Sequence, residues 1–145
     1  QLHHIVDLVQ DTKSETLLDY GCGKGLQYSQ WKHHEEIGVM PELYDPGVPE
    51  YEVLPDGPFD GIYSTDVMEH IPEDSVDYEL KRIFDLTDGV IYFSISSVLS
   101  KKQLKKNVNA HLTVKDQKWW YNKIQKHVKN HIVRGIKYDP NKLEG

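Results

Sequence analysis

The feature that most constrains this chain is a glycine-rich run from Asp19 to Gly25, in which every second residue from position 21 onward is glycine. It directly follows residues 15–19, which are typical of a short buried strand, and it leads into residues 24–34, which favour a helix. A strand-to-helix turn made of glycines lets a ligand approach the backbone, and the start of a helix offers free N–H groups. The run therefore predicts an α/β domain with a ligand at the end of its first strand.

Strand-like and helix-like patterns alternate along the rest of the chain. We expect strands over 42–45, 59–64, 90–95 and 131–138, and helices over 2–11, 73–86 and a segment that begins at Thr113, with Thr113 and Asp116 as its N-terminal cap. The proline-rich stretch 46–58 can hold at most a brief strand over 51–54, and residues 100–112 read as a polar connection. This alternation predicts a Rossmann-like three-layer sandwich, a mostly parallel sheet with helices on both faces. A length of 145 residues fits one domain over 1–145.

Polar side chains stand where the expected strands end. Asp19, Asp45 and Ser96 each follow an apolar stretch, and Ser64 to Asp66 close a third one. Parallel strands have their carboxyl ends at one edge of the sheet, where α/β proteins bind their ligands. We therefore expect these groups to meet in one crevice.

The charge is divided unevenly along the chain. Residues 1–100 carry 5 Lys and Arg against 20 Asp and Glu, a net charge of −15, whereas residues 101–145 carry 12 against 3, a net charge of +9, which together give −6. Either the basic segment packs beside acidic loops, or its field attracts an anionic substrate or partner. The acidic first part makes nucleic acid an unlikely partner.

Two further features concern the location of the protein. No apolar run is long enough to span a membrane, and the first residues do not resemble a signal peptide. The single cysteine, Cys22, allows no internal disulfide, which favours a reducing compartment. We expect a cytoplasmic protein.

The spacing of the glycines narrows the class of ligand. A dinucleotide fingerprint that starts at Gly21 needs a third glycine where Leu26 stands, and the phosphate-binding P-loop pattern also fails. The spacing that fits is Asp-x-Gly-x-Gly-x-Gly over residues 19–25.

The run Leu-Leu-Asp-Tyr-Gly-Cys-Gly-Lys-Gly over 17–25 resembles the first motif of the class I S-adenosylmethionine-dependent methyltransferases. Residues 59–71, which end in Glu-His-Ile, look like the fourth-strand motif of that superfamily.

This resemblance implies roles for individual residues. Asp19 would accept a hydrogen bond from the methionine ammonium, and the backbone at Gly21 and Gly23 would lie beside the methionine part. Asp45, followed by Pro46, would hold the two ribose hydroxyls, because one carboxylate has two acceptor oxygens. The remaining cofactor-binding candidates are Thr65 and Asp66 near the adenine or the transferred methyl group, and Tyr28 near the methionine carboxylate. Simple capping or core packing is the alternative for these side chains.

Methyl transfer from a sulfonium is an in-line displacement, so the protein mainly positions the reactants and excludes water. An acceptor that must lose a proton also needs a base. His70 is the candidate base, and His111 in the segment 107–113 is a second catalytic candidate that could bind substrate or close over the site. The alternatives are that His70 fastens the following helix and that 107–113 is a polar loop. No closely spaced ligand motif supports a metal site.

The sequence also departs from the superfamily. The region after the expected fifth strand is shortened, and the stretch between Asp45 and Phe59 has no room for the usual helix. An unpaired sheet edge would favour a homodimer.

We expect a methyltransferase that acts on a small molecule or an exposed group of a larger one. The alternatives are a non-catalytic binding or interaction module and, less favoured, hydrolysis or cleavage of the cofactor.

Overall fold

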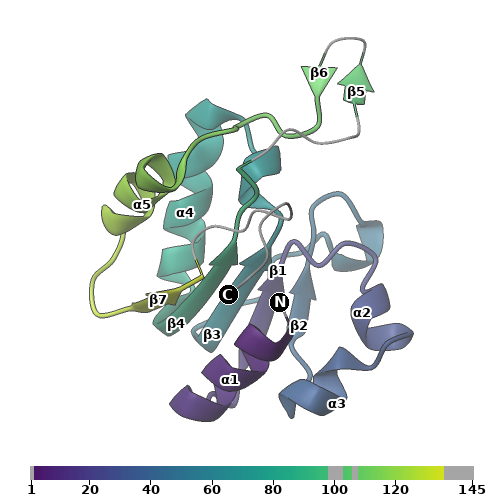
Figure 1. Ribbon diagram of the computed structural model, residues 1–145. Coiled ribbons are helices and arrows are strands. Elements are labelled where there is room, and N and C mark those ends of the chain that lie inside the picture. Colours follow the sequence, from purple (N-terminus) through teal and green to yellow (C-terminus); the bar gives the residue numbers. More distant parts are fainter. Residues whose placement is uncertain (1, 98–102, 106–107, 136–145) are drawn as a thin grey trace.

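The sheet at the centre of the molecule has five strands, all parallel. A computed structural model describes residues 2–97, 103–105 and 108–135. The strands lie in the order β2-β1-β3-β4-β7 (Figure 1). Their bounds are β1, Leu17–Tyr20; β2, Glu42–Tyr44; β3, Phe59–Thr65; β4, Thr87–Ser94; and β7, Ile132–Arg134. The predicted parallel sheet is confirmed.

Helices cover both faces of this sheet, which confirms the predicted three-layer sandwich. On one face lie α1 (Leu2–Thr12), α2 (Leu26–Ser29) and α3 (His33–Ile37), whose buried side chains pack with Leu17, Tyr63 and Tyr92 of the strands. On the other face lie α4 (Val76–Asp85) and α5 (Gln117–Gln125). Three short 3₁₀ helices complete this part of the chain: η1 (Pro49–Tyr51), η2 (Met68–His70) and η3 (Glu73–Ser75).

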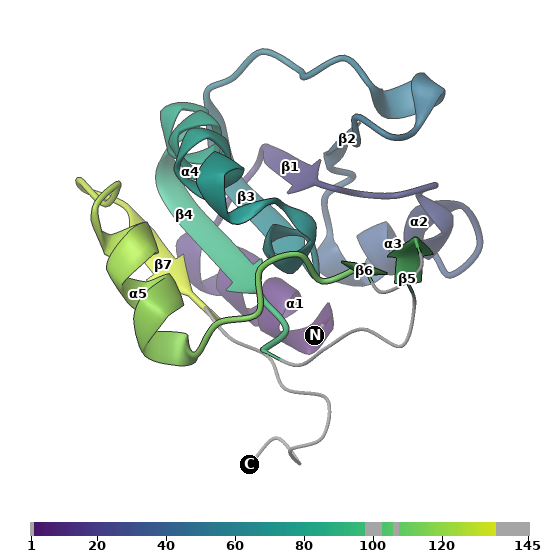
Figure 2. The same ribbon diagram turned by 90° about the horizontal axis from the view of Figure 1, so that it is seen from above.

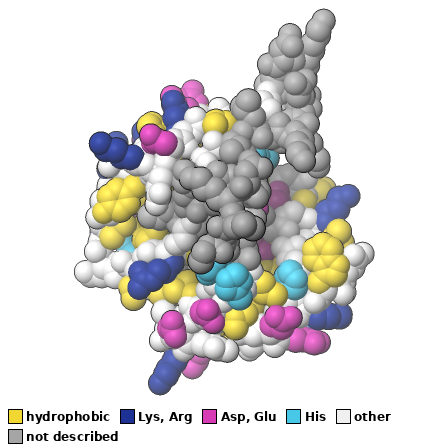
Figure 3. Space-filling view, in the orientation of Figure 1, with side chains coloured by type: hydrophobic (Ala, Val, Ile, Leu, Met, Phe, Trp, Pro, Cys, Tyr) yellow, Lys and Arg dark blue, Asp and Glu magenta, His cyan; other side chains and the backbone are white. Residues whose placement is uncertain are grey.

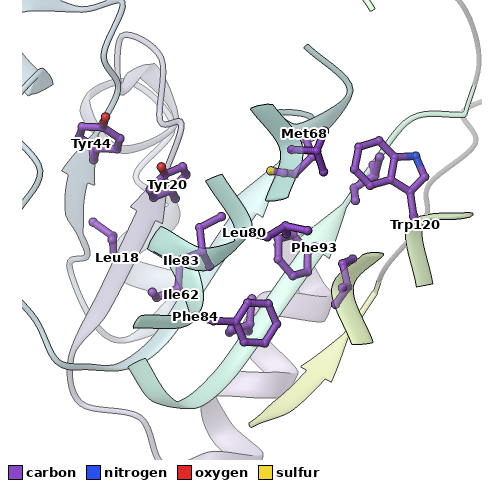
Figure 4. Close-up of a cluster of buried hydrophobic side chains, with 14 of the residues drawn as sticks. Leu18, Tyr20, Tyr44, Ile62, Met68, Leu80, Ile83, Phe84, Phe93 and Trp120 are labelled. Carbon is purple, nitrogen blue, oxygen red and sulfur yellow. The ribbon is translucent and has the colours of Figure 1, made fainter. Parts of the chain in front are cut away.

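The larger core lies between the sheet and the pair α4 and α5. Figure 4 shows Leu18, Ile62 and Phe93 from three strands meeting side chains of α4, with Trp120 of α5 at the margin. Trp120 and Phe93 are fully buried. Strand residues alternate between the two faces, so each inner strand needs apolar residues on both. That requirement explains the uninterrupted apolar run over residues 90–93 of β4.

Two elements predicted between β1 and β3 were wrong in detail. The helix expected over 24–34 is two short helices, α2 and α3, because Lys32 takes a left-handed conformation with φ of 55° and ends helical hydrogen bonding. The brief strand expected over 51–54 is absent from the described residues there, and η1 occupies 49–51 instead. The proline at position 49 suits the first turn of such a helix.

The C-terminal part also differs from the prediction. The cap of α5 is Asp116, whose Oδ1 accepts a hydrogen bond from Trp119 N at 2.8 Å, whereas Thr113 is buried and bonds elsewhere. The expected connection 100–112 contains a small antiparallel pair, β5 (Gln103–Lys105) and β6 (Val108–Asn109). The last strand is confirmed over 132–134, while positions 136–138 of the prediction lie outside the described residues.

The basic C-terminal segment pairs with acidic residues of the first part of the chain. Lys115 Nζ lies 2.8 Å from Glu73 Oε1, and Lys123 Nζ lies 2.9 Å from Asp77 Oδ2. On the face seen in Figure 3, acidic and basic side chains are interspersed around the periphery. These contacts favour the first explanation of the charge asymmetry, in which the basic segment packs beside acidic elements.

Candidate functional site

The glycine-rich loop connects β1 to α2 at the carboxyl edge of the sheet. Gly21 N and Cys22 N both donate to Tyr44 O, at 2.7 and 3.1 Å, which ties the loop to the end of β2. Gly21 has a φ of 90°, and a Cβ at this position would overlap the side chain of Val67. Only glycine therefore lets the loop lie this close to the segment that follows β3.

Asp45 lies beside the same loop, one residue beyond the end of β2. Its Oδ2 accepts a hydrogen bond from Gly23 N at 2.8 Å, and its Oδ1 accepts one from Gly47 N at 2.9 Å. The register of the sheet explains this meeting, because Asp19 and Leu43 are paired across β1 and β2. The two acidic residues singled out in the sequence thus flank one loop, while Pro46 between Asp45 and Gly47 is exposed.

The Asp19 carboxylate is almost entirely buried, with 2% of the residue exposed. Its Oδ2 accepts hydrogen bonds from Tyr28 Oη at 2.5 Å and from Gln27 Nε2 at 3.1 Å. Since the Tyr28 proton is directed to Asp19, the hydroxyl of Tyr63 donates to Tyr28. Burial raises the pKa of Asp19 to about 6, although the bonds from Tyr28 and Gln27 lower it and the charge of Asp45 raises it further. Such a carboxylate favours a cationic partner.

A cavity of about 310 Å³ opens at this loop, a size at the lower end of ordinary small-ligand pockets. The predicted residues that line it are Asp19, Gly21, Gly23, Tyr28 and Thr65. Cys22 of the predicted loop also lines it, and the rest of its wall, which was not predicted from the sequence, comes from α1, α2, α3 and β3: Leu2, Ile5, Gln27, His33, Ile37 and Tyr63. Burial raises the pKa of the Cys22 thiol to about 12, so this thiol is not a nucleophile near neutral pH.

Asp66 follows β3 at the same edge of the sheet. It is exposed and has a φ of 57°, a conformation that is uncommon outside glycine. Its backbone N donates to Ser94 O at 2.7 Å, and its Oδ1 accepts from Ser94 Oγ at 3.3 Å, which fixes it to the end of β4. The turn directs the chain from Thr65, in the cavity wall, toward η2.

His70 ends η2 and lies beside the segment 110–113, which comes from forty residues further along the chain. Its Nδ1 lies 3.0 Å from Ala110 O. A carbonyl oxygen can only accept, so Nδ1 carries a proton, and in the neutral ring Nε2 is the nitrogen with the lone pair. The His111 ring meets His70 edge-on at 4.7 Å between centroids. The two histidines predicted as catalytic are therefore neighbours, although neither lines the cavity at the loop.

Glu69, between Met68 and His70, was not identified as a site residue from the sequence. The residue is fully buried, and its Oε2 accepts from Ser96 N at 2.6 Å. Burial raises the pKa of Glu69 to about 7; the Ser96 bond lowers it and the charge of Asp66 raises it. A charged side chain predicts exposure, because Glu is almost never fully buried, so only the tertiary structure reveals the burial of Glu69.

Two further observations concern metals and membranes. Within the described ranges, no group of three or more His, Cys, Asp and Glu side chains is placed to hold a metal ion. None of the helices in the part of the chain that the structure describes is long and apolar enough to cross a membrane.

A comparison of the sequence with models of known protein families found a match to one family. Residues 2–136 match the sequence model of the family described as "Methyltransferase domain". The comparisons with curated proteins and with solved structures gave no match.

Proposed function

Because this chain belongs to the class I S-adenosylmethionine-dependent methyltransferase superfamily, we propose that the loop 19–25 and Asp45 bind S-adenosylmethionine and that the segments around His70 receive the methyl acceptor. The observation that carries the proposal is the buried Asp19 carboxylate in the wall of the loop cavity. A buried carboxylate with a raised pKa is stabilised in its charged form by a cation, and the methionine ammonium supplies one.

The chain offers groups for each part of this ligand. Asp19 Oδ2 is occupied by Tyr28 and Gln27, which leaves the lone pairs of Oδ1 to face the ammonium. The backbone at Gly21 and Gly23 lies along the methionine part. Tyr28 serves mainly to orient Asp19, because its proton already goes to that carboxylate, so the predicted contact with the methionine carboxylate would require this bond to open.

Asp45 is assigned to the ribose. Both of its oxygens already accept a backbone N–H, from Gly23 and Gly47, but each carboxylate oxygen has a second lone pair for a ribose hydroxyl. These two bonds fix the orientation of the carboxylate before the ligand binds. Pro46 and the residues Thr65 and Asp66 stand on either side of the loop and are assigned to the adenine and the transferred methyl group.

S-adenosylmethionine supplies a methyl group activated on a sulfonium and leaves as S-adenosylhomocysteine. The residues of the chain position the acceptor and, where it must lose a proton, remove that proton. The Nε2 lone pair of His70 is suited to this task, because the bond from Nδ1 to Ala110 O fixes the tautomer. His111, edge-on to His70, is assigned to holding the acceptor or the protonated ring.

The proposal is tested by calorimetric titration with S-adenosylmethionine and S-adenosylhomocysteine. We expect Asp19→Asn, which keeps the shape of the side chain and removes its charge, to weaken binding of both by at least about tenfold. Asp88→Asn is the matched control, because Asp88 is exposed at the start of β4, at the other end of the sheet, and its substitution should leave the affinity unchanged.

Absence of binding of either compound at millimolar concentration would reject the proposal. Tight binding by the Asp19→Asn variant would show that the loop is wrongly assigned. Binding without turnover for any acceptor class would favour the alternative of a non-catalytic module.

A further inference from the structure

Three segments that are distant in the sequence meet at Glu69. The residue itself lies in η2, its Oε2 accepts from Ser96 N just beyond β4, and its backbone O accepts from Thr113 N at 3.1 Å. Figure 2 shows the stretch between β6 and α5 passing beside the 3₁₀ turns that precede α4. Glu69 is thus the one residue of η2 that bonds to both of the other segments in the described structure.

The segment 110–113 is held to η2 and to the residue after it by two further bonds, both made by residues that follow Glu69. His70 Nδ1 donates to Ala110 O at 3.0 Å, and Thr113 Oγ1 donates to Ile71 O at 2.6 Å. Ala110 and Thr113 are buried, whereas His111 between them is partly exposed. The segment is therefore fixed at both ends and presents His111 to the edge of His70.

We propose that Glu69 is a positioning residue, whose carboxyl group clamps the end of β4 to η2 and so holds His70 and His111 in their edge-on arrangement. The preceding residue, Met68, is fully buried and the following residue, His70, is exposed, so Glu69 stands where η2 passes from the core to the surface. A turn as short as η2 has few bonds of its own, and a clamp of this kind fixes the direction of the His70 side chain. The catalytic meaning of the clamp rests on the proposed function, but the clamp itself can be measured without it.

The chemistry of the carboxyl group fits this role. Oε1 is buried and has no hydrogen-bond partner among the described residues, so a full negative charge on the group is costly. The raised pKa agrees with a carboxyl group that is partly protonated near neutral pH. What the clamp needs is an acceptor for Ser96 N–H, which a glutamine side chain also provides.

The test uses the full chain and compares Glu69→Ala with Glu69→Gln by NMR. We expect Glu69→Ala to speed amide exchange of Ser96 and Thr113 at least about tenfold and to change the tautomer signature of the His70 ring nitrogens. Glu69→Gln should keep both close to the original protein. The matched control is Glu73→Ala, because Glu73 lies in the next turn and is an exposed partner of Lys115.

Three results would overturn the proposal. The first is an unchanged His70 signature and unchanged exchange in Glu69→Ala. The second is an equal disturbance in Glu69→Gln, since the acceptor would then not be what matters. The third, which does not depend on any variant folding, is a Ser96 amide that exchanges in the original protein as fast as an exposed one.

Calorimetry separates this proposal from the proposed function. Glu69 does not line the loop cavity, so Glu69→Gln should bind S-adenosylmethionine as tightly as the original protein. Failure of the original protein to bind S-adenosylmethionine would reject the proposed function and leave the NMR result on the clamp intact.

Discussion

The two sides of the carboxyl edge are built in different ways. On the side that we propose binds the cofactor, called the cofactor side, one loop of seven residues and Asp45 are joined by bonds to backbone N–H groups, and the glycines give the loop its shape. On the side that we propose receives the acceptor, called the acceptor side, η2, the end of β4 and the segment 110–113 come from three parts of the chain and meet at side chains. The first side joins segments 22 residues apart along the chain, whereas the second joins segments 40 residues apart.

This difference decides how each side responds to substitution. A change in the loop is expected to act directly on binding of the proposed ligand, because that ligand would lie against the loop backbone. A change in the acceptor side acts through the placement of His70 and His111 and leaves the cavity at the loop unchanged. The two sides touch where Gly21 packs against Val67, so a substitution at this contact should affect both of them.

The largest effect is expected at that contact. In Gly21→Ala the new Cβ overlaps Val67 and the residue must keep a φ of 90°, so we expect a loss of about 2–5 kcal/mol in the free energy of unfolding. Gly23→Ala is the matched control: it also has positive φ, but open space surrounds its Cβ, so only about 1–2 kcal/mol should be lost. Equal losses in chemical denaturation would mean that the two sides are not coupled through Val67.

The pH dependence of cofactor binding tests the role of Asp19 on the cofactor side. The ammonium needs the charged form of Asp19, whose pKa is about 6 before the ligand binds, so affinity should fall roughly tenfold per unit of pH below 6 and be highest between about pH 7 and the pKa of the ammonium itself, about 8. Calorimetry across pH measures this slope. The same slope in Asp19→Asn would assign the titration to another group.

The contribution of Asp19 to the free energy of unfolding should fall as pH rises, whereas its contribution to cofactor affinity should rise. The folded-state pKa of Asp19 lies above its ordinary value of 3.8, so the folded protein holds this proton more tightly than the unfolded chain does. The contribution of Asp19 to stability is therefore present below pH 4 and is lost as pH rises through 6. Asp19→Asn should unfold at higher denaturant concentration than the original protein at pH 8; a lower midpoint would contradict this sign.

The comparison of the two sides also explains what could be predicted from the sequence. The parallel sheet could be predicted from the alternation of strand and helix patterns, and the loop and the place of Asp45 from glycine spacing and strand ends, because each of these patterns lies within a short stretch of the sequence. The burial of Glu69 and the bond from Thr113 to Ile71 depend on contacts between distant segments, and no pattern in the sequence indicated the left-handed conformation of Lys32. Thr113 and Asp116 show the limit well: the pattern placed a cap in this region, but only the packed structure decides which residue caps α5.

A smaller effect is expected from Thr113→Val on the acceptor side. The substitution keeps the shape and removes the donor to Ile71 O, so about 1–2 kcal/mol of stability should be lost. Amide exchange should rise locally in the segment 110–113, while the affinity for S-adenosylmethionine stays the same. Weakened cofactor binding would show that the two sides are less separate than the structure implies.

The smallest effect is expected outside both sides. Asp116→Ala removes the cap of α5, and we expect a loss of about 1 kcal/mol in chemical denaturation. Neither cofactor affinity nor the His70 ring signals should change. A change in either would show that α5 also influences the acceptor side.

The central claim is that the loop 19–25 holds the cofactor, and NMR titration with S-adenosylhomocysteine tests it most directly. Saturable shifts of the backbone amides of Gly21, Gly23 and Asp45 are expected, with Asp60 and Gly89 at the opposite edge of the sheet unmoved. Absence of shifts in the loop, or shifts centred on Asp60 and Gly89, would contradict the account.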